Sequence, residues 1–143
     1  MIIATVLRDY LDALKDAATD AGLAVTVMLG YPEEGRPLPA LPVFAFRFES
    51  DDFYRGGAAR RLGSTVPAGV QLGATLALFT ENEYQLFQMV DFLRTQKSAL
   101  THLTVGTDVF NLVYGATTRM GQGQSDIQNH AAETGVTFVA LMK

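Results

Sequence analysis

The segment Val70–Lys97 changes from a strand pattern to a helix pattern within one dipeptide, and this change limits the possible folds more than any other feature. Over residues 70–79 apolar side chains occupy alternate positions, the two-residue period of a pleated strand. Over residues 81–97 they return every three or four positions, as in an amphipathic helix. Thr80 precedes Glu83 by three residues, the spacing of a capping box, which predicts that Thr80 caps this helix. The predicted apolar stripe consists of Tyr84, Phe87, Val90 and Leu93, widened by Leu86, Met89 and Phe92.

The same two periodicities predict the remaining elements. An amphipathic stripe predicts a first helix over residues 2–21, and Gly22 stands where a left-handed cap would end it. Residues 43–49 alternate, and their three phenylalanines share one face that we expect in the core. Further strands are predicted at 23–29, 98–105, 109–117 and 136–142. Irregular segments are predicted at 31–42, 50–69 and 118–135.

The order of these elements predicts the fold class. A helix is followed by three strands, a second helix and three more strands, so the chain lacks the strict alternation of a parallel α/β sheet. We therefore expect an α+β fold, with a mostly antiparallel sheet, two helices packed on one of its faces, and long loops. A length of 143 residues predicts one domain over residues 1–143.

Composition narrows the possible functions. The chain has no cysteine, which excludes disulfides, thiolate catalysis and zinc–thiolate sites, and we expect neither a metal nor a cofactor. Only 18% of the residues are charged, against about a quarter in typical soluble domains. This low fraction indicates a surface covered by other subunits, as in a homo-oligomer. A sequence pI near 5.0 argues against general nucleic-acid binding. No apolar run has the roughly eighteen residues of a membrane-spanning helix, and the N-terminus differs from a signal peptide, so we expect an intracellular site of synthesis.

The sequence has only weak catalytic patterns. Its most informative feature for function is a predicted loop that contains arginines. His102 and His130 have no sequence partners that indicate a catalytic group, although they would be the first suspects in an enzyme. Within residues 50–69, three arginines stand near glycines and aromatic residues. Three interpretations of this segment remain: a solvated loop, an arm that contacts a protein partner, or a contact to DNA phosphates.

The order of elements in this chain resembles that of the tail terminator (tail completion) proteins of tailed bacteriophages. The resemblance rests on the N-terminal amphipathic helix, the strands around Val25, Phe46 and Leu76, the second helix, and the closing strand VTFVALMK. That resemblance implies a non-catalytic virion protein, made in the host cytoplasm, that forms a hexameric ring on the tail tube. The ring would stop tube polymerisation and dock to the head-side connector.

The resemblance implies three protein partners: further copies of the chain, the tail tube protein and the connector. It implies no membrane and no specific nucleic acid, although genome DNA would pass through the ring. Other small neck, minor tail or baseplate proteins are an alternative, and a small intracellular enzyme is a further one. The residues predicted to contact partners are Phe53, Tyr54, Arg55, Arg60, Arg61, Arg119, Gln122 and Gln124.

Overall fold

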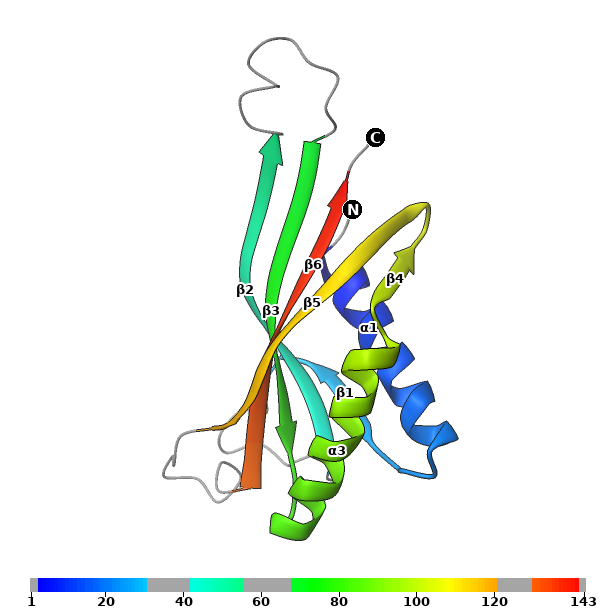
Figure 1. The fold of residues 1–143 in the computed structure, drawn as a ribbon, viewed down its shortest axis with the longest axis vertical. Helices are drawn as coiled ribbons and strands as arrows, with labels where there is room; N and C mark the ends of the chain where they lie inside the picture. Colours follow the sequence, from blue (N-terminus) through cyan, green and yellow to red (C-terminus); the bar gives the residue numbers. More distant parts are fainter. Residues whose placement is uncertain (1–2, 31–41, 56–67, 121–129, 142–143) are drawn as a thin grey trace.

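The computed structural model describes residues 3–30, 42–55, 68–120 and 130–141, with side chains left out at 51–55, 68–70 and 141. The elements follow in the predicted order, and the α+β class is confirmed (Figure 1). Gly22 has a φ of +79° directly after the first helix, as its predicted cap requires. The elements are α1 (Ile3–Asp20), β1 (Thr26–Leu29), β2 (Val43–Arg55), β3 (Ala68–Phe79), α3 (Glu83–Ala99), β4 (His102–Val105), β5 (Asp108–Arg119) and β6 (Ala131–Leu141).

The strands form one twisted sheet in the order β1-β2-β3-β6-β5-β4. Only β1 and β2 are parallel; the other neighbouring strands run antiparallel, as predicted. β2 and β3 form the longest ladder, which runs from the pair Val43↔Phe79 to the pair Arg55↔Ala68. In Figure 1 the far half of this hairpin rises well above both helices. The sheet therefore has a lower half covered by helices and an upper half that projects beyond them.

Both helices pack on the same face of the sheet, which confirms the predicted layering. Tyr10 of α1 is fully buried and places its ring 5.2 Å from that of Phe46 and 5.6 Å from that of Phe138. Phe92 of α3 lies 6.2 Å, ring to ring, from Phe44. Side chains of both helices belong to one apolar cluster with these strand residues. The opposite face has a smaller cluster made of Val43, Ala45, Ala77, Phe79 and Ala131.

The central strands are longer than the sequence pattern predicts. The prediction of an irregular segment over 50–69 is wrong at both ends, because β2 continues to Arg55 and β3 begins at Ala68. A register shift between Phe48 and Ser50 interrupts the alternation of side chains, which explains why the sequence pattern stops there. The predicted loop over 118–135 is likewise too long, since β5 runs to residue 119 and β6 begins at residue 131.

The start of α3 also differs from its prediction. Asn82, not Thr80, caps the helix: its side chain accepts a hydrogen bond from the backbone N–H of Gln85 at 2.8 Å. The Gln85 side chain accepts from the N–H of Glu81 at 2.8 Å, one residue before the cap, whereas a capping box would have it accept from the N–H of Asn82. The buried Thr80 hydroxyl is used elsewhere, because it donates to the carbonyl of His130 at 2.6 Å. Thr80 therefore fastens the end of β3 to the start of β6.

Candidate interaction surface

The outward side of α3 carries two aromatic residues of the predicted apolar stripe. Tyr84 is 78% exposed and Phe87 is 62% exposed, whereas Leu86 and Met89 are buried. The predicted stripe is therefore wrong in its first half, and Val90 is only partly buried. The reason is that α3 has two overlapping apolar faces, and packing against the sheet selects the face of Leu86 and Met89. Phe48, also predicted for the core, is 51% exposed on β2.

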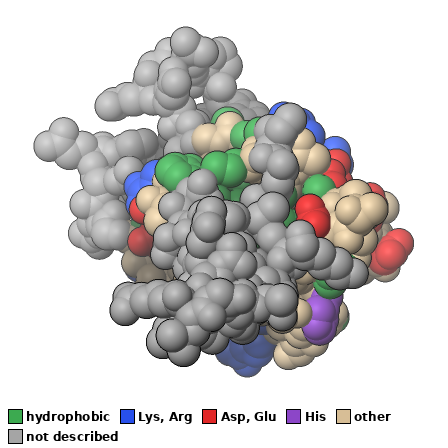
Figure 2. Space-filling model, turned by 90° about the horizontal axis from the view of Figure 1, so that it is seen from above, with side chains coloured by type: hydrophobic (Ala, Val, Ile, Leu, Met, Phe, Trp, Pro, Cys, Tyr) green, Lys and Arg blue, Asp and Glu red, His purple; other side chains and the backbone are tan. Residues whose placement is uncertain are grey.

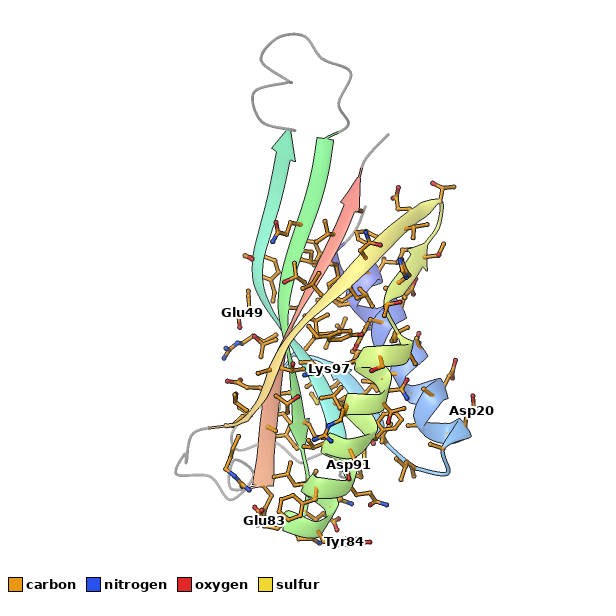
Figure 3. The ribbon with its side chains drawn as sticks, in the orientation of Figure 1. Asp20, Glu49, Glu83, Tyr84, Asp91 and Lys97 are labelled. Atoms are coloured by element: carbon orange, nitrogen blue, oxygen red, sulfur yellow. The ribbon has the colours of Figure 1, made fainter. Side chains whose placement is uncertain are left out.

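The exposed aromatic residues continue along α3 into charged residues. Tyr84, Phe87, Asp91 and Arg94 follow at steps of three, four and three, so they lie in one line on the helix surface. We call this line the outer stripe of α3. All four side chains are exposed, and within the part of the chain that the structure describes, Asp91 and Arg94 form no salt bridge. Figure 3 labels Tyr84 at the lower end of α3 and Asp91 near its middle.

A groove of about 420 Å³ runs beside the outer stripe, between α3 and the ends of β5 and β6. Its lining combines apolar side chains with an aspartate and two arginines. This combination is typical of a surface that contacts another protein, because aromatic residues and arginine are enriched there. The lining residues are Leu86, Phe87, Val90, Asp91, Arg94, Thr117, Thr118, Arg119 and Ala132.

Glu83 anchors the lower end of this surface. One carboxylate oxygen accepts a hydrogen bond from Arg119 at 2.7 Å, and the other lies 3.2 Å from Nδ1 of His130. The hydrogen bond from Arg119, and then that from His130, hold the pKa of the Glu83 carboxyl below its usual value. Glu83 in turn raises the pKa of Arg119. These contacts join the first turn of α3 to the end of β5 and the start of β6.

Lys97 fixes the other wall of the groove. Its ammonium group donates to the carbonyl of Gly115 and to the hydroxyl of Thr117, both at 2.8 Å. β5 changes register between Tyr114 and Thr117, so the lysine holds the strand at its irregular point. Burial lowers the pKa of Lys97. Its two hydrogen bonds link α3 to β5.

Further exposed apolar side chains lie on β5. Val109 is 54% exposed and Val113 is 57% exposed, and their position in the strand directs them away from the helix-covered face. In a view from above, basic and acidic side chains are spread around the described surface without a region of one sign (Figure 2). The described side chains in that view therefore form no basic surface of the kind that nucleic-acid binding uses.

The predicted partner-contacting residues are only partly within the described chain. Phe53, Tyr54 and Arg55 lie in β2, and Arg119 ends β5, where it is already paired with Glu83. Arg60, Arg61, Gln122 and Gln124 lie outside the described residues.

The sequence interpretation missed the outer stripe of α3. A signal for it existed, because the line through Tyr84 and Phe87 continues into Asp91 and Arg94. Charged residues on the same side of a helix indicate that this side faces solvent, even where its first residues are aromatic.

The two histidines lie on different parts of the fold and have different contacts. His102 is exposed on β4, with Nδ1 2.9 Å from the hydroxyl of Thr101, while His130 contacts Glu83. Among the described residues, no three or more histidine, aspartate or glutamate side chains group as metal ligands would. Within those same residues, none of the helices has the length and apolarity to cross a membrane.

A comparison with protein-family models finds no match, and a comparison with curated proteins finds no significant match.

Proposed function

We propose that this chain is a structural subunit of the ring that closes the tail tube of a tailed bacteriophage. The main support is the arrangement of the sheet. β2 ends at the top of Figure 1, where the hairpin projects past the helices, whereas β5 ends at the lower left. The two segments predicted to contact partners are attached at these opposite ends. A ring between a tail tube and a connector needs contacts in two opposite directions, and strands that end at opposite ends of the sheet support such an arrangement.

Exposed apolar side chains provide a second argument. Phe48, Val109 and Val113 are each more than half exposed, on β2 and β5. In a chain with only 18% charged residues, such side chains are candidates for contacts between neighbouring subunits. A ring is built from two different surfaces of each subunit, repeated around an axis until the circle closes. The projecting hairpin on one side and the outer face of β5 on the other are two such surfaces.

Tube growth measured in solution tests the proposal. The tail tube protein of a phage that encodes this chain is polymerised with and without the purified chain, and tube lengths are measured by electron microscopy. We expect the chain to stop growth at substoichiometric amounts and to be found, by antibody labelling, at one tube end. Tubes of equal length in both reactions, with no end labelling, would refute the proposal. Bovine serum albumin at the same concentration controls for non-specific effects.

A further inference from the structure

We infer that the outer stripe of α3 binds the same stripe of a second copy of this chain, with the two helices antiparallel about a twofold axis near Val90. The inference concerns a surface away from the projecting hairpin and the outer face of β5, and it does not depend on the proposed ring. Four observations carry it: the order of residues in the stripe, their charges, the groove beside them, and the space left in the helix layer.

The order of residues makes the stripe complementary to itself. Its N-terminal half holds two exposed aromatic rings, Tyr84 and Phe87, and its C-terminal half holds Arg94. In an antiparallel pair centred between residues 90 and 91, Phe87 of one copy lies opposite Arg94 of the other, and the twofold axis repeats this contact. A guanidinium on an aromatic face is a favourable cation–π contact. Parallel helices would instead place aromatic rings on rings and arginine on arginine.

The charges support the same orientation. Asp91 lies one turn from Phe87 on the same helix. The Arg94 side chain of the other copy lies opposite Phe87, and is therefore within about one turn of Asp91. Each aspartate can therefore pair with an arginine of the other copy, giving two equivalent ion pairs. In the same register the two Asp91 carboxylates face each other near the axis, and the two arginines offset their repulsion. Both residues are exposed and neither has a salt-bridge partner in the described part of the chain, so the monomer leaves these charges available.

Among the described residues, the two helices leave part of the helix-covered face of the sheet open. α1 and α3 cover one face of a six-stranded sheet, and neighbouring helices pack about 8–10 Å apart while strands lie about 4.8 Å apart. Two helices thus span about four strands. The groove of about 420 Å³ lies between α3 and the ends of β5 and β6. The contacts of Glu83 with Arg119 and His130 close its lower end, and α3 of a second copy would lie over its open side.

A charge exchange between the two positions provides the sharpest test. Purified full-length chain is studied by analytical ultracentrifugation over a range of concentrations. We expect Asp91→Arg and Arg94→Asp each to raise the dimer dissociation constant at least about tenfold, because each places like charges opposite one another. The double variant Asp91→Arg with Arg94→Asp restores opposite charges and should recover the dimer in part, because aspartate at position 94 cannot make the cation–π contact with Phe87. The exposed Lys15→Asp variant on α1 controls for a change of charge elsewhere.

Disulfide trapping gives an independent measurement that does not require a charge change. The chain has no cysteine, so a single introduced thiol reports only contacts between copies. Val90→Cys, beside the expected axis, should form a covalent dimer under mild oxidation, whereas Asp12→Cys on the exposed side of α1 should not.

The outcomes separate this inference from the proposed ring. Loss of dimer in both single variants, recovery in the double variant and trapping at residue 90 would support it. A monomer at all concentrations would overturn it. A larger ring whose mass is the same in wild type, Asp91→Arg and Arg94→Asp would also overturn it, while leaving the ring proposal intact. Equal trapping at residues 90 and 12 would count against it as non-specific collision.

Discussion

The hydroxyl group of Tyr10, in the middle of α1, lies 3.1 Å from the hydroxyl group of Tyr114 on β5. Tyr114 donates its own proton to the carbonyl of Leu100 at 2.7 Å, so the Tyr10 hydroxyl is the donor between the two tyrosines. This short chain crosses from α1 to β5 and ends just after α3. Because Tyr10 is fully buried, its only polar atom depends on Tyr114 for a partner.

The two tyrosines should therefore respond differently to replacement by phenylalanine. Tyr114→Phe leaves the buried Tyr10 hydroxyl without an acceptor and should lower the free energy of unfolding by about 1–3 kcal/mol. Tyr10→Phe leaves the bond from Tyr114 to Leu100 intact and should cost about 1 kcal/mol. The double variant should cost less than the sum of the two. Urea unfolding followed by circular dichroism measures all three, and equal costs with full additivity would contradict the hydrogen-bond chain.

The same burial predicts a loss of stability at alkaline pH. Burial, followed by the neighbouring Tyr114, raises the pKa of Tyr10 above its ordinary value of about 10. Above pH 10 the unfolded chain releases the Tyr10 proton while the native chain keeps it, so the unfolded state binds fewer protons. The free energy of unfolding should therefore be unaffected by Tyr10 below pH 10 and fall above it, by about 1.4 kcal/mol per pH unit. Tyr10→Phe should flatten this fall, and an unchanged slope would refute the assignment.

Much of the fold could be predicted because the relevant signals are local. The switch from period two to period 3.6 after Phe79 identifies β3 and α3 without any tertiary information, and Gly22 marks the end of α1. The extra length of β2 could not be predicted, because it depends on cross-strand pairing with β3 beyond a register shift at Phe48. Such pairing stabilises residues whose own pattern resembles a loop.

Neighbouring residues on α3 test which face of the helix is buried. Leu86 is 3% exposed, so Leu86→Ala should lower the free energy of unfolding by about 2–5 kcal/mol through lost burial and a cavity. Phe87 is 62% exposed, and Phe87→Ala should cost under about 1 kcal/mol although it removes a larger side chain. Thermal and urea unfolding of the two variants measure the difference. A larger cost for Phe87→Ala than for Leu86→Ala would instead show that Phe87 is buried, as the sequence predicts.

The cap of α3 is tested by a second pair of variants. Asn82→Ala removes the acceptor for the N–H of Gln85 and should cost about 1 kcal/mol, whereas Asn82→Gly should cost only a few tenths. Both are measured by urea unfolding, with Gln88→Ala on the exposed side of the helix as control. If Asn82→Ala proved as harmless as that control, the cap would have to lie elsewhere.

The interaction surface was harder to predict than the fold, for a physical reason. Tyr84 and Phe87 are apolar residues at helical spacing. No local signal distinguishes an aromatic ring that packs on a sheet from one that stays exposed on the surface. The distinction depends on the rotation of α3, which is set by Leu86 and Met89 fitting the sheet. Likewise, Arg119 is identifiable as an arginine near a strand end, but its pairing with Glu83 requires the fold.

The last prediction concerns the arginine segment between β2 and β3. The sequence predicts an irregular segment at Arg60 and Arg61, and substitutions in such segments usually cost little, so replacing both by glutamate should leave stability unchanged. It should nevertheless impair docking, since reversed charges at a paired interface repel the partner. In a phage that encodes this chain, electron microscopy should then show tails of abnormal length or tails without heads.

The matched control for this variant changes charge by the same amount at another place. Arg8→Glu with Lys15→Glu reverses two exposed cations on α1, far from the end of the hairpin. Phage with these changes should have normal tails, and circular dichroism of both purified proteins should match wild type. Normal tail length and head joining in the Arg60→Glu, Arg61→Glu phage would refute a role for these arginines. Equal defects in both variants would instead show that net charge, and not the position of the arginines, governs assembly.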